Sequence, residues 1–269
     1  MTNLLIIGER INGMFQDVKK AIQTKDKTII QNLAKRQVEA GAQVLDVNVG
    51  PASSDQIGTM KWLVETIQES VDVQLALDSS KPNVIKEAIG LCKKPAFINS
   101  TTAQKEKLDV LLSLAIEREA SLIGLTMDEK GIPRDADSRA EMAVKIITEA
   151  MEKGLPMERL YLDPIILPCN VAQAQAPQVL ETIRQIKILA SPPPKTVLGL
   201  SNVSQGTPLR PLINRTYLIM AIAAGLDAAI VDPLDKELME AAATAELLLN
   251  KTIYCDSFLD VRHAPGTIK

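Results

Sequence analysis

The sequence has a single histidine, His263, and only three cysteines, which are far apart and form no CxxC pair. A Ser-His-Asp or Cys-His catalytic arrangement and a histidine metal site are therefore excluded. An odd number of separated cysteines fits reduced thiols better than a disulfide framework or a zinc site. We expect this chain to bind no metal.

Long apolar runs, basic stripes and nucleotide-binding loops are also missing. No apolar stretch approaches the ~20 residues that a membrane helix needs, and no signal segment opens the chain. Thirty basic and 33 acidic residues give a net charge of -3, without the basic surface that nucleic-acid binding requires. No GxxxxGK[ST] phosphate loop occurs. We expect a soluble, cytoplasmic protein that binds neither membranes nor nucleic acid.

The chain does contain eight short apolar runs, each followed by a helix-like stretch. They span residues 4–9, 44–50, 74–79, 96–101, 121–127, 160–165, 196–202 and 228–233. Eight strand–helix units predict an α/β fold, a single-domain (β/α)8 TIM barrel over residues 1–258, with a C-terminal tail at 259–269. An open doubly wound sheet is the alternative. The count of eight and the lack of GxGxxG after the first run argue against it.

Helix-length segments lie between these runs, with apolar residues spaced three and four apart. Two examples are Val18–Ala40 and Ser138–Lys153. The second has start signals: Asp137 or Ser138 can cap it, and Glu141 stands where a capping box requires an acid.

Most of the apolar runs end in a carboxylate or an amide. In a parallel barrel these ends meet at the rim that carries the active site. The side chains are Glu9, Asn12, Asp46, Asn48, Asp78, Asn99, Asp163, Asn202 and Asp232. One such residue is often only a helix cap or turn residue, but repetition at strand after strand favours a binding site. An ionised Asp accepts two parallel N–H bonds, which matches the amino-substituted edge of a reduced pterin.

Six motifs in barrel order carry a resemblance to a known family. They are GERING (8–13), DVNVG (46–50), ALDSS (76–80), INST (98–101), LDP (162–164) and GLSNVS (199–204). Together they resemble the pterin-binding barrel family, and within it the methyltetrahydrofolate:corrinoid/iron-sulfur protein methyltransferases of acetyl-CoA synthesis, the Wood-Ljungdahl pathway. The folate-binding region of cobalamin-dependent methionine synthase is similar, notably at SNVS. The resemblance covers roughly residues 4 to 258.

The resemblance also implies roles for particular residues. It implies that Asp78, Asn99 and Asp163 hold the pterin ring, and that Asn202 approaches the N5 atom that carries the methyl group. Other rim residues match motifs that line the family's pocket, or lie beside them, without an individual contact. These are Glu9, Asn12, Asp46, Asn48, Ser201 and Asp232.

The activity implied is transfer of the N5 methyl group of methyltetrahydrofolate to cobalt(I) of a corrinoid. No DxHxxG corrinoid motif occurs, so the corrinoid is expected on a partner corrinoid/iron-sulfur protein. An amine anion cannot leave in water, so a proton must reach N5, and Asn202 would stabilise the changing charge. The family also implies a homodimer. The segment Asp128–Asp137 is either a docking loop for the partner or a plain surface loop.

Dihydropteroate synthases share the barrel, but they carry a G-x-S-R-K-like segment after the seventh strand, and residues 199–204 lack its cations. This difference argues against condensation with loss of diphosphate and for methyl transfer. Two alternatives remain. The same transfer could run in reverse, from a methylated corrinoid protein to tetrahydrofolate, during methylamine, betaine or methyl-ether use. The chain could also be a pterin-binding barrel without turnover.

Overall fold

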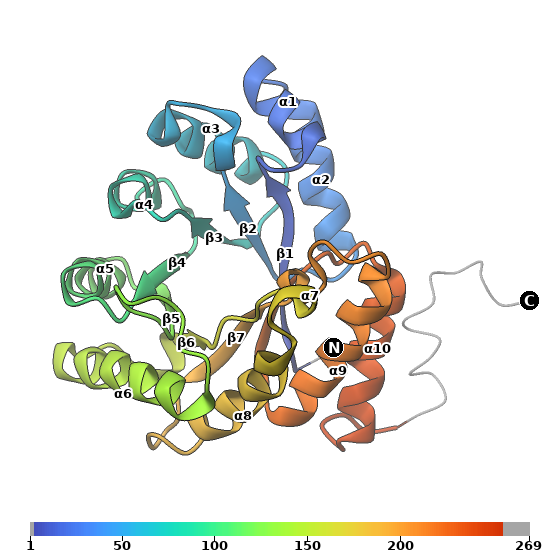
Figure 1. The fold of residues 1–269 in the computed structure, drawn as a ribbon. Coiled ribbons are helices and arrows are strands. Elements are labelled where there is room, and N and C mark those ends of the chain that lie inside the picture. Colours follow the sequence, from blue (N-terminus) through green and yellow to red (C-terminus); the bar gives the residue numbers. More distant parts are fainter. Residues whose placement is uncertain (1–2, 255–269) are drawn as a thin grey trace, which may run out of the picture.

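Eight parallel strands close into a barrel in which neighbours in sequence pair and β1 also pairs with β8 (Figure 1). The structure, a computed structural model, describes residues 3–254. The strands are β1 (Leu5–Asn12), β2 (Val44–Asn48), β3 (Gln74–Asp78), β4 (Phe97–Thr102), β5 (Ser121–Leu125), β6 (Leu160–Asp163), β7 (Lys195–Gly199) and β8 (Ala228–Val231). The predicted barrel is confirmed. The predicted boundary at 258 and the tail at 259–269, with His263, lie outside the described residues.

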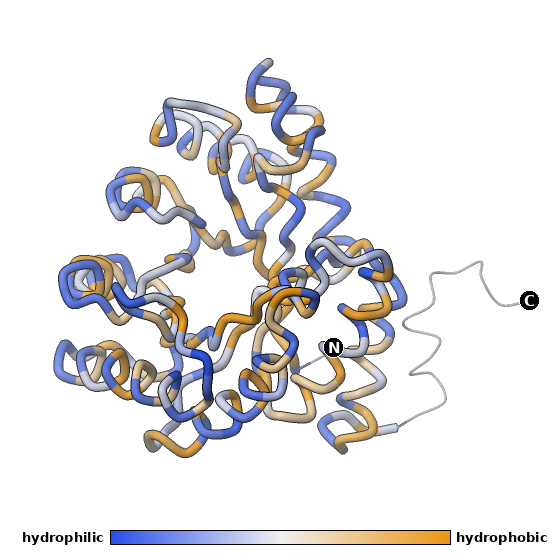
Figure 2. Tube along the Cα trace, viewed as in Figure 1, coloured by the Kyte–Doolittle hydropathy of each residue, from blue (hydrophilic) through white to orange (hydrophobic). Residues whose placement is uncertain are grey.

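Helices surround the strands and bury their apolar faces against them. The α-helices are α1 (Gln16–Thr24), α2 (Lys27–Glu39), α3 (Gln56–Gln68), α4 (Pro82–Ile89), α5 (Lys105–Glu117), α6 (Ala136–Lys153), α7 (Cys169–Ala172), α8 (Ala176–Ile186), α9 (Arg210–Ala224) and α10 (Lys236–Leu248). Short 3-10 helices are η1 (Gly50–Ala52), η2 (Met157–Arg159), η3 (Gln173–Gln175) and η4 (Leu200–Ser204). Figure 2 shows helices that mix hydrophilic and hydrophobic residues around largely hydrophobic strands.

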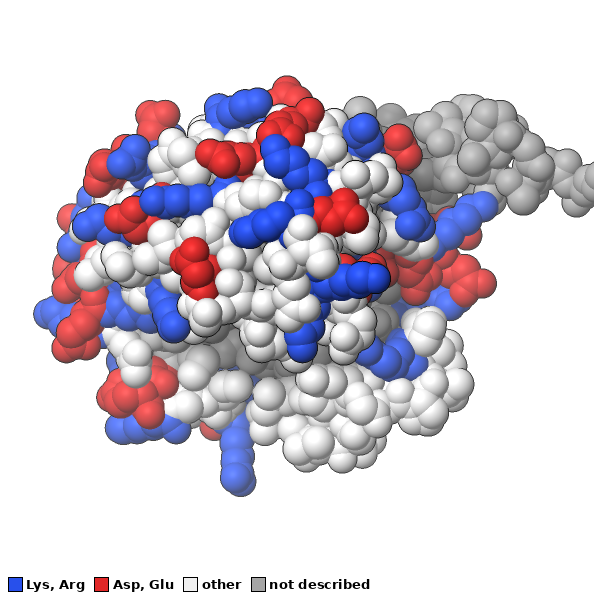
Figure 3. All heavy atoms as spheres, turned by 90° about the horizontal axis from the view of Figure 1, so that it is seen from above, with Lys and Arg blue, Asp and Glu red and all other residues white. Residues whose placement is uncertain are grey.

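Basic and acidic side chains are mixed on the surface, as the nearly equal numbers of the two in the sequence predict. On the face drawn in Figure 3, Lys and Arg are interspersed with Asp and Glu, without a field of one sign. Among residues 3–254, no helix combines the length and the apolar character that a bilayer-spanning segment needs.

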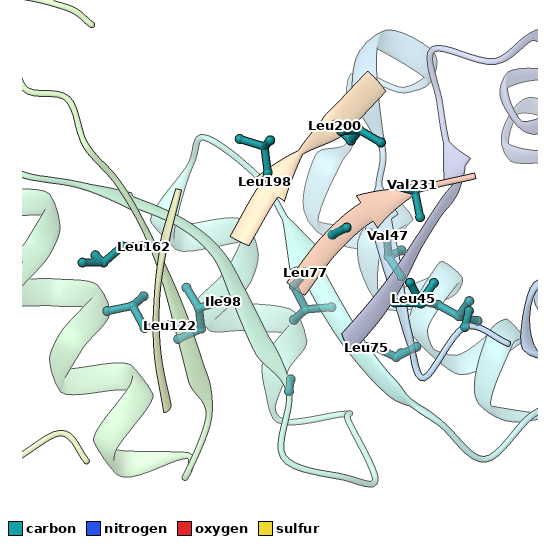
Figure 4. Close-up of a cluster of buried hydrophobic side chains, with 14 of the residues drawn as sticks. Leu45, Val47, Leu75, Leu77, Ile98, Leu122, Leu162, Leu198, Leu200 and Val231 are labelled. Carbon is teal, nitrogen blue, oxygen red and sulfur yellow. The ribbon is translucent and has the colours of Figure 1, made fainter. Parts of the chain in front are cut away.

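Alternate strand residues form two separate apolar clusters. The inner cluster fills the barrel and comprises Ile7, Val44, Ala76, Phe97, Ile123, Tyr161, Val197 and Ala228. The outer cluster joins the strands to the helices, and Figure 4 shows part of it, including Leu45, Leu75, Ile98, Leu122, Leu162 and Leu198. Both faces of each strand are buried, which explains why the strands are continuous apolar runs in the sequence. A residue two positions after an inward one is inward again.

The first predicted helix is wrong in one respect, because residues 18–40 form two helices. Lys25 has a left-handed backbone with φ of 55° and ends α1. Asp26 then caps α2, since its carboxylate accepts a hydrogen bond from the Thr28 N–H at 2.9 Å. An apolar period of three to four continues through this break, so the period alone does not reveal it.

The predicted cap of the second helix is also wrong. Asp135 caps α6, because its carboxylate accepts hydrogen bonds from the N–H and the hydroxyl of Ser138 at 2.8 and 3.0 Å. Asp137 and Ser138 therefore lie inside the helix, and Glu141 forms no capping box with Ser138.

The loops after β1 and β2 touch at Gly13, which leads to a prediction. The Gly13 N–H donates to the Asn48 carbonyl at 2.9 Å, and a Cβ at Gly13 would lie 2.0 Å from the Val49 carbonyl oxygen. Backbone cannot yield cheaply, so we expect Gly13→Ala to lower the free energy of unfolding by about 2 kcal/mol or more. Denaturant titration measures this.

Gly90→Ala is the matched control. Gly90 has φ of -65°, and the atom nearest to an added Cβ is a guanidinium nitrogen of Arg118 at 3.7 Å. We expect this variant to stay within about 0.5 kcal/mol of the wild type or to gain slightly. Equal unfolding midpoints for Gly13→Ala and the wild type would contradict the close approach.

Candidate functional site

Polar side chains occupy the inward positions near the carboxyl ends of several strands. Glu9 follows Ile7 by two residues, and the same spacing separates other polar residues from members of the inner cluster. The structure thus places Glu9, Asp46, Asn48, Asp78, Asn99 and Asp163 on the inward side of the strands near their carboxyl ends, and we name these six residues the polar rim. Strand register supports this arrangement, because Asn48 pairs with Asp78, which pairs with Asn99. Their binding roles stay predictions.

Two carboxylate–amide pairs make up one side of the polar rim. Asn99 donates from Nδ2 to Asp46 Oδ1 at 2.9 Å, and Asn48 donates from Nδ2 to Asp78 Oδ2 at 2.5 Å. The Asn48 side-chain oxygen accepts from the Gly50 N–H at 2.6 Å, which fixes the orientation of this amide. Asp46 therefore orients Asn99, and the Asn99 side-chain oxygen is left to act as an acceptor.

Burial governs the charge of these two acids. Asp46 is 3% exposed, and its pKa lies well above its usual range because it is desolvated and because Asp78 lies nearby. Burial raises the pKa of Asp78 too, while its hydrogen bond from Asn48 and the charge of Lys107 act in the opposite direction. Lys107, on α5, in turn has a lowered pKa because it is partly desolvated.

Asp163 is held by backbone donors on the other side of the polar rim. Its Oδ1 accepts from the Ile165 N–H at 2.7 Å, and its Oδ2 accepts from the Gly199 N–H at 3.2 Å. Desolvation raises its pKa to about 6, although both hydrogen bonds lower it. The result is a buried carboxylate in a fixed orientation, ionised at neutral pH, with lone pairs left for a ligand.

Ser201 and Asn202 lie on η4 and not on a strand, since β7 ends at Gly199. A Cβ at Gly199 would stand 3.3 Å from Asn202 Nδ2 and 3.9 Å from Asp163 Oδ2. Asn202 and Asp163 therefore lie on either side of the space that a side chain at Gly199 would fill, and the glycine leaves this space open. Asn202 is exposed, in contrast to the buried acids.

Asn12 and Asp232 accept a hydrogen bond from the N–H two residues ahead, as Asn48 and Asp163 also do. The Asn12 side-chain oxygen accepts from the Met14 N–H at 2.9 Å, and Asp232 Oδ1 accepts from the Leu234 N–H at 3.0 Å. Such bonds to a residue two positions ahead are typical Asx turns. Asp232 also lies 3.8 Å from the guanidinium of Arg10.

Sequence reasoning missed three residues around the polar rim. Lys107 comes from a helix, and Gln37 is fully buried on α2, where its side-chain oxygen accepts from the Arg10 N–H at 3.0 Å. Arg210 begins α9 and donates to the Ser204 hydroxyl at 3.2 Å and the Ser201 carbonyl at 3.4 Å. Residues 199–204 contain no cation, but the guanidinium of Arg210 contacts this segment through these two hydrogen bonds. None of the three follows a strand, so no strand-end signal marks them.

The polar rim therefore offers oriented acceptors with few donors, which suits the edge of a donor-rich heterocycle. A family model described as a pterin binding enzyme matches residues 9–232. The chain belongs to this family. The resemblance seen in the six motifs is confirmed, and the matched span begins and ends at Glu9 and Asp232.

Relatives and solved structures agree with the family. The chain is 33% identical over 260 residues to methylcorrinoid:tetrahydrofolate methyltransferase of Eubacterium limosum, covering 95% of this chain and 94% of that protein. It is 28% identical over 242 residues to methionine synthase of Mycobacterium tuberculosis, covering 85% of this chain and 20% of that protein.

Solved dihydropteroate synthases share the fold. The Yersinia pestis enzyme with a pterine-sulfa conjugate has a TM-score of 0.68 and 18% identity, covering 92% of this chain and 94% of that one. The Coxiella burnetii enzyme with pteroic acid has a TM-score of 0.69 and 15% identity, covering 93% and 94%. At such identities the likeness concerns the fold alone.

Buried acids with raised pKa values predict how stability depends on pH. Glu9, with a pKa of about 7, and Asp163, with a pKa of about 6, are more acidic in the unfolded chain. Their stabilising contribution is complete below about pH 4 and is lost as pH rises through 6 to 7. For Asp163 alone the upper limit is about 3 kcal/mol. We expect the Tm of the ligand-free protein to fall by about 5 °C from pH 5 to pH 8 in calorimetry.

Two variants locate the source of this decline. Asp163→Asn should make the fall smaller, whereas Glu141→Gln, on the exposed face of α6, should leave it unchanged. A Tm that is equal at both pH values, or higher at pH 8, contradicts the charge assignment.

Proposed function

We propose that this protein is a methyltransferase that moves a methyl group between N5 of tetrahydrofolate and the cobalt of a corrinoid carried by a partner protein. The observation that carries this proposal is the juxtaposition of Asn202 with Asp163 at Gly199, beside the acceptors of the polar rim. Similarity to a methylcorrinoid:tetrahydrofolate methyltransferase along nearly the whole of both chains supports it.

The polar rim is proposed to hold the pyrimidine edge of the pterin. Asp163 cannot rotate freely, because both of its oxygens accept backbone hydrogen bonds. Its remaining lone pairs suit the amino group and the neighbouring ring N–H. Asp78 and Asn99 complete the set, with Asn99 oriented by Asp46.

Asn202 is proposed to stabilise the change of charge at N5. When the methyl group passes to folate, an N5–carbon bond forms, the cobalt–carbon bond breaks with its electron pair left on cobalt, and N5 loses its proton. In the opposite direction a proton must reach N5, so that a neutral amine leaves. An amide does not titrate near neutrality, but a hydrogen bond that is strongest in the transition state contributes ~10² to 10³ in rate.

The physiological direction and the partner belong to the proposal. The sequence favoured transfer from folate to a corrinoid/iron-sulfur protein, as in acetyl-CoA synthesis. The name of the relative with 33% identity describes the opposite transfer, from a methylcorrinoid to tetrahydrofolate. We therefore propose a methylated corrinoid protein as the physiological donor and tetrahydrofolate as the acceptor. A homodimer, and docking of the partner at residues 128–137, stay predictions.

The catalytic role of Asn202 can be tested with free methylcobalamin and tetrahydrofolate as probes. We expect Asn202→Ala to lower the methyl-transfer rate by ~10²-fold while folate binding changes less than about threefold. The absorbance change of cobalamin reports transfer, and titration calorimetry reports binding. Asn32→Ala, on an exposed position of α2, is the control and should behave as wild type.

Two results speak against the proposal. Equal rates for wild type and Asn202→Ala would remove the role of Asn202. Tight folate binding with no transfer in either direction, from methylcobalamin or to cob(I)alamin, would favour a binding protein without turnover.

Asp163 is expected to matter for binding more than for the chemical step. Replacing it with Ala leaves two backbone N–H groups, of Ile165 and Gly199, without their acceptor and removes the proposed anchor. We expect Asp163→Ala to weaken tetrahydrofolate binding by at least about tenfold in titration calorimetry. A folded variant with full affinity contradicts the anchoring role, and circular dichroism checks the fold.

A further inference from the structure

Glu9 occupies a bulge in β1 whose geometry is supported from outside the barrel. The β1–β2 pairing passes from Gly8 with Leu45 to Ile11 with Val47, so that Glu9 and Arg10 together oppose Asp46. Gln37 from α2 holds this bulge through its hydrogen bond from the Arg10 N–H. A Cβ at Gly8 would come within 2.5 Å of the Gln37 side-chain oxygen, so glycine makes room for it. Bulges beside active sites often aim one side chain.

The aimed side chain contacts the turn that carries Asn202. The Ser201 hydroxyl donates a hydrogen bond to Glu9 Oε1 at 2.6 Å, although 192 residues separate the two in sequence. Ser201 immediately precedes Asn202 on η4. The Ser201 carbonyl also accepts hydrogen bonds from the Ser204 hydroxyl at 3.3 Å and from Arg210 at 3.4 Å. Glu9, on β1, thus anchors η4, which follows β7, across the intervening strand β8.

We propose that Glu9 is a positioning residue for methyl transfer, whose carboxylate fixes the turn that presents Asn202 through the hydroxyl of Ser201. This proposal rests on the proposed function. It assigns Glu9 no contact with folate. Its effect on the reaction passes through Ser201 to Asn202.

The charge around Glu9 makes this bond sensitive to pH. Desolvation raises the pKa of Glu9 to about 7, and the charge of Asp232 raises it further, whereas the Ser201 hydrogen bond, Arg210 and Arg10 lower it. Asp46, on the neighbouring strand, also interacts with the charge of Glu9. An ionised carboxylate only accepts hydrogen bonds and holds the Ser201 hydroxyl strongly. Protonation below about pH 7 weakens this hold.

The test compares Glu9→Gln, Glu9→Ala and Ser201→Ala with the wild type between pH 5.5 and 8.5. We expect the wild-type kcat to rise through about pH 7, and this rise to disappear in Glu9→Gln, whose amide oxygen still accepts from Ser201. At pH 8, Glu9→Gln should keep kcat within about threefold, while Glu9→Ala and Ser201→Ala should each lose about tenfold. KM and the Kd for tetrahydrofolate should change little.

Two further measurements separate positioning from a general structural role. The double variant Glu9→Ala/Ser201→Ala should be no slower than either single variant, because both remove one bond. Hydrogen exchange in residues 200–204 should be faster in Glu9→Ala than in the control Glu39→Ala, on an exposed position of α2. This second readout needs no activity.

Several outcomes would overturn the role of Glu9. One is an active wild type whose kcat is unchanged in Glu9→Ala. A second is a double variant in which the losses of kcat of the two single variants multiply. A third is a variant in which only KM changes. A wild-type protein without any methyl transfer would instead overturn the proposed function. The exchange measurement would then show by itself whether Glu9 anchors η4.

Discussion

Along each strand, side chains alternate between the interior of the barrel and the surface that faces the helices. In a closed barrel every second side chain points inward, so a shift of one residue would exchange the contents of the barrel with its helix-facing surface. The inward positions are apolar in the middle of the strands and become polar at their carboxyl ends, as from Ile7 to Glu9 or from Tyr161 to Asp163. One rule thus produces both the core and the polar rim.

The apolar layer directly beneath the polar rim determines its electrostatics. Ala76 and Phe97 exclude water from below, and desolvation is the largest cause of the raised pKa of Asp46, Asp78, Asp163 and Glu9. Each acid receives a compensating donor: an amide for Asp46 and Asp78, backbone N–H groups for Asp163 and a hydroxyl for Glu9. One donor only partly offsets the cost of burying a carboxylate. The remaining lone pairs can therefore accept further hydrogen bonds from a donor-rich ligand.

The sequence predicted the features that arise from repetition along the chain. Eight apolar runs predicted eight strands, and six of the nine polar residues expected at their ends lie in the polar rim, whereas Asn202 lies on η4 and Asn12 and Asp232 form Asx turns. What it did not reveal depends on contacts between distant segments. The bulge at Glu9 needs Gln37 of α2 in the space above Gly8, and Lys107 reaches the vicinity of Asp78 from a helix. Neighbouring candidates explain the other misses: Asp26 caps α2 within a continuing apolar period, and Asp135 caps α6 close to Asp137 and Ser138, which can also act as caps.

The side chains proposed to bind the pterin are buried deeper than the side chain proposed to assist methyl transfer. Asp46, Asn99 and Asp163 are at most 8% exposed, whereas Asn202 is exposed on a 3-10 turn. A ring held by the buried side chains would keep its N5 region near the outer limit of the rim, beside Asn202. This arrangement is what an enzyme needs when the other reacting centre arrives on a separate protein, because that centre cannot enter a barrel filled with side chains. A turn at this shallow position presents Asn202 well only when it is held in place, and Glu9 of β1 supplies such an anchor through Ser201.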